Sequence, residues 1–308
     1  MPIEIARRRG LSLVELLVVV ALTGLVGSII AGTLSRQQRF YGDAAEVGFV
    51  RESVRDAIDV LSTDIRQMSA ADTVRLRADS AIEFFSTIGS SVVCKLDGNE
   101  IGLPIVRTSG NSLGAALTQP DTGDLAAFYS DSGSNGGKWE RHRILGVDSR
   151  SVASSCPISS GFSTQSDVEA GTTSLVLVLA SAVSSPVHPG RPVRFLRRGR
   201  YSLYHASDGD WYLGYRRCNA IGPSVCGATQ PISGPYRSYS ANAQTSGLVF
   251  EYFDSTGQRL GPTASPFALA RVDITARGER RNRFSTSGVS GRVSDSATVA
   301  VAIRNRVR

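Results

Sequence analysis

The sequence has little lysine and histidine, and it lacks several short motifs that mark catalytic sites. Lys95 and Lys138 are its two lysines, and it has three histidines. It contains no H-E-x-x-H, Walker A or G-x-G-x-x-G pattern, which argues against a zinc protease, a P-loop nucleotidase and a dinucleotide enzyme. We therefore predict that the protein is not an enzyme and holds no cofactor and no metal.

Apolar stretches of membrane-spanning length are also scarce, since residues 16–35 form the one long apolar run without a charged side chain. This excludes a polytopic membrane protein. Hydrophobic residues make up 41% of the chain and charged residues 20%, which excludes wholesale disorder. The 31 glycines and 12 prolines are too many for a helical bundle and favour short strands joined by turns.

The N-terminal region has the pattern of a membrane anchor. Residues 16–35 just reach the ~20 apolar residues that a membrane-spanning helix needs. Arg7, Arg8 and Arg9 precede them, and basic residues hold that end of a span in the cytoplasm. A secretory signal peptide is the alternative, but its apolar region is only ~7–15 residues long. Glu15 lies within the apolar segment at a cost of at least ~2.5 kcal/mol, so we expect it to have a partner and a function.

The segment Gly10-Leu11-Ser12-Leu13-Val14-Glu15-Leu16-Leu17-Val18 resembles the class III signal of type IV prepilins and type II secretion pseudopilins. That signal is a basic leader ending in Gly, then an apolar residue, then Glu at mature position five. The resemblance implies cleavage between Gly10 and Leu11 by a prepilin peptidase, and N-methylation of Leu11. Most members have Phe where this chain has Leu11. The resemblance also implies that Glu15 contacts the N-terminal amine of a neighbouring subunit during assembly.

After the apolar run, the sequence predicts an amphipathic helix. No proline occurs from residue 11 to 68, so one helix can run nearly 60 residues. The alternative is two helices broken between Arg36 and Gly42. Apolar residues at three- and four-residue steps form one face, which we expect to pack on a globular head; they are Val47, Val50, Val54, Ile58, Leu61, Ile65 and Met68.

The rest of the chain predicts a β-rich head. We therefore expect an α+β, pilin-like fold, in which a long N-terminal helix packs on a mostly antiparallel β head. Gly199 separates two arginine-flanked runs and predicts a hairpin, and residues 207–210 predict a turn. The stretches 110–123, 130–138, 149–171 and 219–245 predict loops. The predicted strands are 73–77, 81–86, 91–96, 125–129, 140–147, 175–180, 193–197, 201–205, 211–217, 248–253, 270–276 and 297–303.

With no internal repeat, we divide the chain into a leader (1–10), a membrane or filament-core helix (11–35), an amphipathic helix (36–70) and one head domain (71–308). The C-terminal part is similar to PilW-like minor pilins and to the J-type minor pseudopilin, because the chain closes on a strand followed by Arg-Asn. This similarity bears on fold and family placement alone.

Four cysteines favour an oxidising compartment and allow three pairings. Cys218 and Cys226 flank a short loop and form the expected pair, which leaves Cys94 for Cys156. A metal site is the alternative, but the chain has no C-x-x-C and its histidines lie far from the cysteines in sequence. Residues 131–136 faintly resemble a calcium loop, but His142 stands where such a loop needs a bidentate glutamate.

Arginine groups and a net charge of +7 raise DNA binding as a further possibility. The first group is interleaved with tyrosines and a tryptophan, and the alternative is a solvated strand face with its aromatic side chains in the core. The two groups are Arg191, Arg194, Arg197, Arg198 and Arg200, and Arg277, Arg280, Arg281 and Arg283.

Taken with the resemblance, these features predict a minor pilin that primes or enters a type IV pilus. Its expected partners are the prepilin peptidase, other major and minor pilins, and the inner-membrane assembly platform. The expected location is the inner membrane, with a single pass and a periplasmic head, and then the filament at the cell surface. The alternatives are a minor pseudopilin of type II secretion and a membrane-anchored DNA- or surface-binding module.

Overall fold

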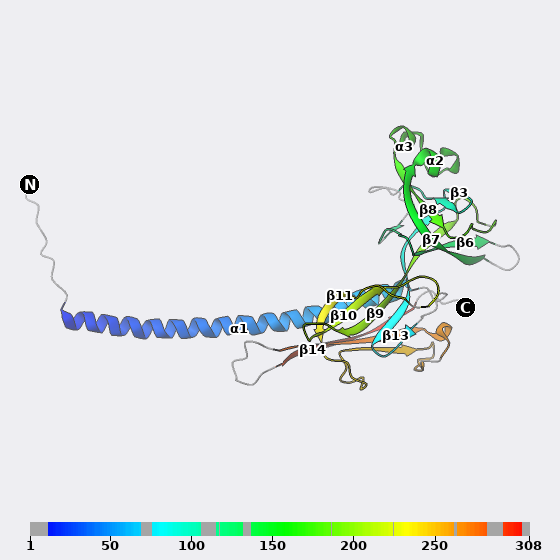
Figure 1. The fold of residues 1–308 in the computed structure, drawn as a ribbon. Helices are drawn as coiled ribbons and strands as arrows, with labels where there is room; N and C mark the ends of the chain where they lie inside the picture. Colours follow the sequence, from blue (N-terminus) through cyan, green and yellow to red (C-terminus); the bar gives the residue numbers. More distant parts are fainter. Residues whose placement is uncertain are drawn as a thin grey trace, which may run out of the picture.

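The computed structural model describes residues 12–68, 76–105, 115–116, 118–131, 137–185, 187–223, 225–261, 264–281 and 292–303. It has an α+β fold in which one long helix, α1 (Leu13–Gln67), projects from a β-rich head (Figure 1). The predicted leader, residues 1–10, and the cleavage residues Gly10 and Leu11 lie outside the described residues.

Helix α1 is continuous over 55 residues, so the expected alternative of a break between Arg36 and Gly42 is wrong. At 1.5 Å per residue it is about 80 Å long. Ser12 caps its first turn, and it ends where Met68 adopts an extended conformation. Its buried residues begin at Val50 and continue to Ile65, which confirms most of the predicted face; Val47, at 40% exposure, does not belong to it.

The strands all pair antiparallel and form one strongly branched sheet. Their order is β12-β13-β11-β10-β9-β6-β7-β8-β4-β3, with β14 on β13 and with β1, β5 and β9 on β2. The bounds are β1 Leu76–Arg77, β2 Ala81–Val92, β3 Lys95–Asp97, β4 Glu100–Gly102, β5 Ala115–Ala116, β6 Leu125–Asp131, β7 Gly137–Ser151, β8 Thr173–Leu179, β9 Pro192–His205, β10 Trp211–Arg217, β11 Gln230–Tyr236, β12 Leu248–Phe253, β13 Arg271–Arg281 and β14 Arg292–Ala302.

Two hydrophobic cores lie at the two ends of the long strands β2 and β9. The proximal lobe packs residues 50–68 of α1 on β10–β14 and on one end of β2 and β9. The distal lobe is built from β3–β8, the other end of β2 and β9, and the short helices α2 (Val152–Ser155), η1 (Ile158–Ser160) and α3 (Gln165–Glu169). Figure 1 shows the distal lobe standing away from the line of α1.

Helix and sheet approach closely in the proximal lobe because one strand residue has no side chain. A Cβ atom at Gly278 of β13 would lie 2.8 Å from Val50 Cγ1 and 2.9 Å from Val54 Cγ2. Tyr236 and Ser53 add polar contacts across the same boundary. The Tyr236 hydroxyl donates to the Ser53 carbonyl over 2.7 Å, and the Ser53 hydroxyl donates to the Gly234 carbonyl over 2.8 Å.

The predicted hairpin at Gly199 is wrong, because β9 runs unbroken from Pro192 to His205. Gly199 pairs with Phe84 of β2 on one side and Arg217 of β10 on the other. A glycine is needed there for packing, since a Cβ atom would lie 2.5 Å from the Tyr215 ring. The turn predicted at 207–210 is confirmed, with φ +89° at Gly209.

Strand β11 lies inside the stretch 219–245 that was predicted to be a loop. It contains Pro231 and Pro235, which cannot donate ladder hydrogen bonds and therefore hide a strand from sequence patterns. Likewise the stretch 149–171 contains α2, η1 and α3, and β2 joins much of what was predicted as two strands.

The structure joins Cys94 to Cys156 in the distal lobe and Cys218 to Cys226 beyond the end of β10, as expected. Each disulfide constrains a region with little strand structure. Cys94 and Cys156 form a small core with Val152, and Cys218 and Cys226 close the loop that leads toward β11.

Candidate functional site

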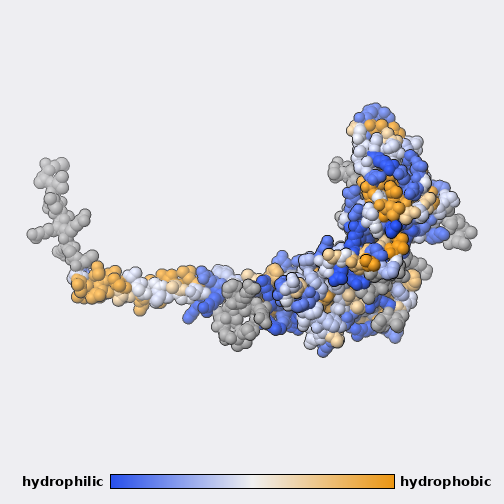
Figure 2. Space-filling model, in the orientation of Figure 1, coloured by the Kyte–Doolittle hydropathy of each residue, from blue (hydrophilic) through white to orange (hydrophobic). Residues whose placement is uncertain are grey.

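The first half of α1 has no buried face in this chain. Every large apolar side chain from Leu13 to Leu34 is more than half exposed, from 51% at Val18 to 76% at Leu13. Figure 2 shows these residues as an apolar rod that is separated from the head by hydrophilic residues. The segment is long and apolar enough to cross a membrane, and it can serve as an anchor. We call residues 13–35 the apolar half and residues 50–68 the packed half.

The hydroxyl groups of the apolar half are satisfied within the helix. Thr23 donates to the Val19 carbonyl, Ser28 to that of Leu25, Thr33 to that of Ile29 and Ser35 to that of Ala31, over 2.5–2.9 Å. A helix with internally bonded polar groups suits either lipid or the interior of a helical assembly.

Small residues give the apolar half room for a neighbouring helix. A Cβ atom added at Gly24, Gly27 or Gly32 would meet no other atom within 4 Å. In a membrane, small residues allow helix backbones to approach closely. These glycines do no packing work among the described residues, so another chain is the simplest reason for tolerating their cost in helix stability, ~1 kcal/mol each.

The head-side end of the apolar half has the side chains of a membrane interface. Arg36 and Arg39 follow the last apolar turn, and the rings of Phe40 and Tyr41 are 68% and 70% exposed. Aromatic and basic side chains gather where a span meets the lipid headgroups. The apolar half is therefore bounded at one end by Glu15 and at the other by this group.

Glu15 has a structural partner that the sequence analysis missed. Its carboxylate accepts the Ser12 N–H over 3.0 Å, and its own N–H donates to the Ser12 hydroxyl over 3.2 Å. This reciprocal arrangement is a capping box, and the S-x-x-E spacing from Ser12 to Glu15 encodes it. Glu15 thus holds the first turn of α1 together, one residue from the predicted new N-terminus at Leu11.

The first arginine group is largely paired within the head. Arg191 lies 3.6 Å from Asp131, and Arg194 stacks over the Trp139 ring at 4.5 Å. The other three guanidinium groups, those of Arg197, Arg198 and Arg200, bind carboxylates at 2.5–3.0 Å. Tyr201 is buried in the proximal core. The arrangement matches paired arginines around core aromatics better than a free basic groove for DNA.

The second arginine group is divided. Arg280 lies 3.0 Å from Glu46 and stacks over Phe49 at 4.7 Å. Arg277 donates to the Ser246 carbonyl over 2.9 Å, and burial lowers its pKa. The side chains of Arg281 and Arg283 lie outside the described residues.

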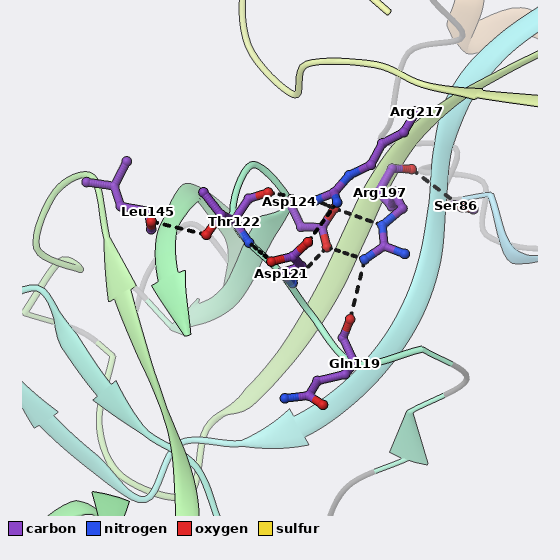
Figure 3. A network of polar contacts seen from close by, with 8 residues as sticks. All are labelled: Ser86, Gln119, Asp121, Thr122, Asp124, Leu145, Arg197 and Arg217. Atoms are coloured by element: carbon purple, nitrogen blue, oxygen red, sulfur yellow. Dashed lines mark hydrogen bonds and ion pairs between the residues drawn. The ribbon is translucent and has the colours of Figure 1, made fainter. Parts of the chain in front are cut away.

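An ion network ties the start of β6 to β9 and β10 (Figure 3). The buried Asp124 carboxylate accepts from Arg197 over 2.7 and 3.0 Å and from Arg217 over 2.9 Å. Arg217 also binds Asp121 over 2.9 Å, and this hydrogen bond lowers the pKa of that carboxyl. Because Asp124 precedes the distal strand β6 and Arg217 ends the proximal strand β10, the network fixes how the lobes meet.

One group of side chains has metal-ligand spacing within the described part of the chain, namely Glu83, Cys218 and Cys226. The two sulfurs are joined as a disulfide, so neither is a thiolate ligand. The Glu83 carboxylate already accepts from Arg198 over 2.7 Å and from Arg200 over 2.8 Å. This arrangement is a buried ion pair beside a disulfide and a poor metal site.

The residues examined for catalysis have local structural partners. His142 Nδ1 lies 2.9 Å from the Ser181 hydroxyl, and His205 Nε2 lies 3.2 Å from the Gly209 carbonyl. Asp208 caps its own turn by accepting the Asp210 N–H over 3.0 Å. Most of the calcium-like segment, residues 132–136, lies outside the described residues.

One G-x-S-x-G sequence is present at positions 110–114, outside the described residues. In hydrolases this sequence forms a turn between a strand and a helix. Here the next described elements are the strands β5 and β6, so the surroundings differ from a nucleophile elbow.

The largest cavity is a polar cleft of about 620 Å³ in the proximal lobe, lined in part by Trp211, Arg237, Glu279 and Arg292. Its charged groups pair with one another, since Glu279 binds Arg237 at 3.0 Å and Arg292 at 2.5 Å. Comparison with family models, with curated proteins and with solved structures gives no match to this chain. The apolar half of α1, with Glu15 at its start, is therefore the candidate functional site.

Proposed function

We propose that the protein is a minor pilin, a structural subunit that primes or enters a type IV pilus. The observation that carries the proposal is the single uninterrupted helix, whose first half is apolar on every side and whose second half is built into a folded head. Such a helix needs cover along about 35 Å. Lipid supplies that cover before assembly, and the helices of other pilins supply it in a filament.

Assembly is the proposed activity, and it needs no catalytic residue. The prepilin peptidase cuts between Gly10 and Leu11 on the cytoplasmic face, and Leu11 is N-methylated. The platform in the inner membrane then lifts the subunit, the apolar half enters the filament core, and the disulfide-bonded head faces outward from the periplasmic side. The proposed partners are these two machines and the other pilins.

Glu15 has two proposed roles that use the same carboxylate. In the isolated subunit it closes the capping box with Ser12. In the filament its charge pairs with the N-terminal amine of a neighbour, which fixes axial register because a slipped subunit leaves a buried charge unpaired.

Substitutions at Glu15 separate these roles. Glu15→Gln keeps the capping box, since Gln serves at this position too, but it removes the charge. We expect normal cleavage and head folding, and at least ~10-fold less protein in sheared filaments. Ser12→Ala is the matched control, because it weakens the cap and keeps the charge. If Glu15→Gln enters filaments normally and Ser12→Ala does not, Glu15 acts through the cap alone.

Processing provides the direct test of the proposal. N-terminal mass spectrometry of the protein from cell envelopes should find N-methyl-Leu11. Retention of Met1, or a cut after Ala31, would show that the chain is not a prepilin. A mature N-terminus at Leu11 together with neighbouring genes for a secretion secretin and a K-type pseudopilin would assign the subunit to type II secretion.

A further inference from the structure

Strand β14 forms one edge of the proximal sheet and has no covering strand. It pairs with β13 over its whole length, from Arg292 opposite Arg281 to Ala302 opposite Arg271. The helix-facing side of β14 carries residues such as Val299 and Val301, which pack on the core. On the other side the residues are small and exposed, namely Ser294, Ser296, Thr298, Ala300 and Ala302.

The register shows which backbone groups point away from the sheet. Ile303 donates its N–H to the Ala270 carbonyl, so residues 301, 299 and 297 face β13, because facing alternates along an antiparallel ladder. Arg277 confirms this phase, since its N–H and carbonyl bond to Gly247 and Arg237 on the far side of β13. Hence the N–H and C=O groups of Thr298, Ala300 and Ala302 point outward, and no described residue bonds to them.

The other edges of the sheet are closed or short. On the outer side of β12, Phe250 donates to the Asp79 carbonyl and the Tyr252 carbonyl accepts from Leu260, both over 2.7 Å. At the distal end, β3 has three residues. Natural proteins protect edge strands with proline, lysine, bulges or covering loops. Along β14 the one such device is the Asp295 carboxylate, which accepts the Ser296 N–H over 2.9 Å.

We propose that β14 is an assembly site, at which an extended segment of a different subunit adds as a further strand. The exposed side chains beside the edge are small and uncharged, so an incoming backbone can reach the outward groups of Thr298, Ala300 and Ala302. Strand addition of this kind gains its affinity from main-chain hydrogen bonds.

The direction of α1 identifies the occupant as a different subunit. Figure 1 shows β14 lying beneath α1 and along the same line. Antiparallel pairing of two β14 strands would point their apolar halves in opposite directions, which two copies anchored in one membrane cannot do. This step rests on the proposed function, because it assumes that all subunits share one membrane orientation.

Thr298→Pro tests the site. Proline removes the outward N–H and is tolerated at an edge position whose N–H is not used within the fold. Thr298→Ala is the matched control, because both changes remove the hydroxyl contact with Thr275 at 2.9 Å while Ala keeps the N–H. In cross-linked envelopes containing the full chain, we expect Thr298→Pro to lower the yield of complexes about tenfold and Thr298→Ala to leave it unchanged.

Hydrogen exchange of the wild-type chain gives an answer even if the proline variant does not fold. Between detergent-dispersed monomer and native envelope complex, the peptide covering β14 should gain protection at the amides of Thr298, Ala300 and Ala302. The proposal is overturned if no complex forms, if these amides stay unprotected in it, or if a folded Thr298→Pro chain assembles normally. A protected edge in a chain that still begins at Met1 would support this site and refute the pilin assignment.

Discussion

The two halves of α1 belong to one helix, yet they are built for different surroundings. In the packed half, Val50, Val54, Ala57, Leu61 and Ile65 lie on one face and are at most 1% exposed, while charged residues occupy the other positions. In the apolar half, large hydrophobic side chains occur on every face and all are exposed. A one-sided stripe indicates a partner within the same chain, and an all-round surface indicates cover from outside it.

The difference also appears in the glycines. Gly278 lies where the packed half meets the sheet, and no side chain fits there. In contrast, Gly24, Gly27 and Gly32 of the apolar half touch nothing within the chain. The close approach that glycine permits is used within the head and remains available in the apolar half.

Reduction of both disulfides should have the largest effect and should separate the halves. Each native disulfide of a small domain contributes about 2–5 kcal/mol, and the bond that closes the longer loop contributes more. Cys94 and Cys156 are 62 residues apart, and Cys218 and Cys226 are 8 apart. Urea unfolding of the detergent-solubilised chain should therefore shift most in a Cys94→Ala/Cys156→Ala variant. The reduced chain should stay in the membrane fraction after carbonate washing; its release would mean that the head holds it there.

A leucine truncated in each half should give opposite results. Leu61 is fully buried and Leu25 is 59% exposed. We expect Leu61→Ala to lower the unfolding free energy of the head by about 2–5 kcal/mol, because it leaves a cavity between helix and sheet. Leu25→Ala should leave that energy unchanged. Equal losses in urea unfolding would show that the halves are not energetically separate.

A methyl group added to a glycine in each half should distinguish them more finely. Gly278→Ala forces Val50 and Val54 away from β13, and we expect a loss of about 1–3 kcal/mol. Gly24→Ala has open space around it and should raise local helix stability by about 0.5–1 kcal/mol without changing the head. Circular dichroism and urea titration of the same preparations would measure both effects.

Acidity should affect the packed half alone, and this effect should be the smallest. Burial raises the pKa of the Asp64 carboxyl, which accepts a hydrogen bond from the Tyr201 hydroxyl. The folded state therefore holds the Asp64 proton to a higher pH than the unfolded chain does, and the contribution of this group to stability is lost as pH rises through the folded-state pKa. Asp64→Asn should flatten that part of the stability profile. An unchanged slope would show that another group is responsible.

Patterns with a regular period were readable from the sequence. The three- and four-residue spacing predicted the packed half, and alternating apolar residues predicted β10 and β12 with their observed bounds. The pairing of the cysteines agreed with expectation because one pair is close in sequence. Membrane-spanning length was readable for the same reason, since it depends on local composition alone.

Features that depend on distant neighbours were not readable. Gly199 resembled a turn residue, but it is fixed by the Tyr215 ring of the next strand. The prolines of β11 argued against a strand whose position is set by β10 and by α1. The Glu15 cap was an exception, because the S-x-x-E pattern is local and could have been recognised. The open edge of β14 depends on the order of strands, which no local pattern gives.

The ladder between β2 and β9 has a mechanical consequence. It extends from Ala81 opposite Ser202 to Val92 opposite Pro192 and so passes from one lobe into the other. A pull between the membrane end of α1 and the distal lobe runs along these strands, and it loads their hydrogen bonds in shear instead of opening them one by one. The Asp124 network braces the same junction against bending. A head joined in this way can transmit tension while its two cores stay folded.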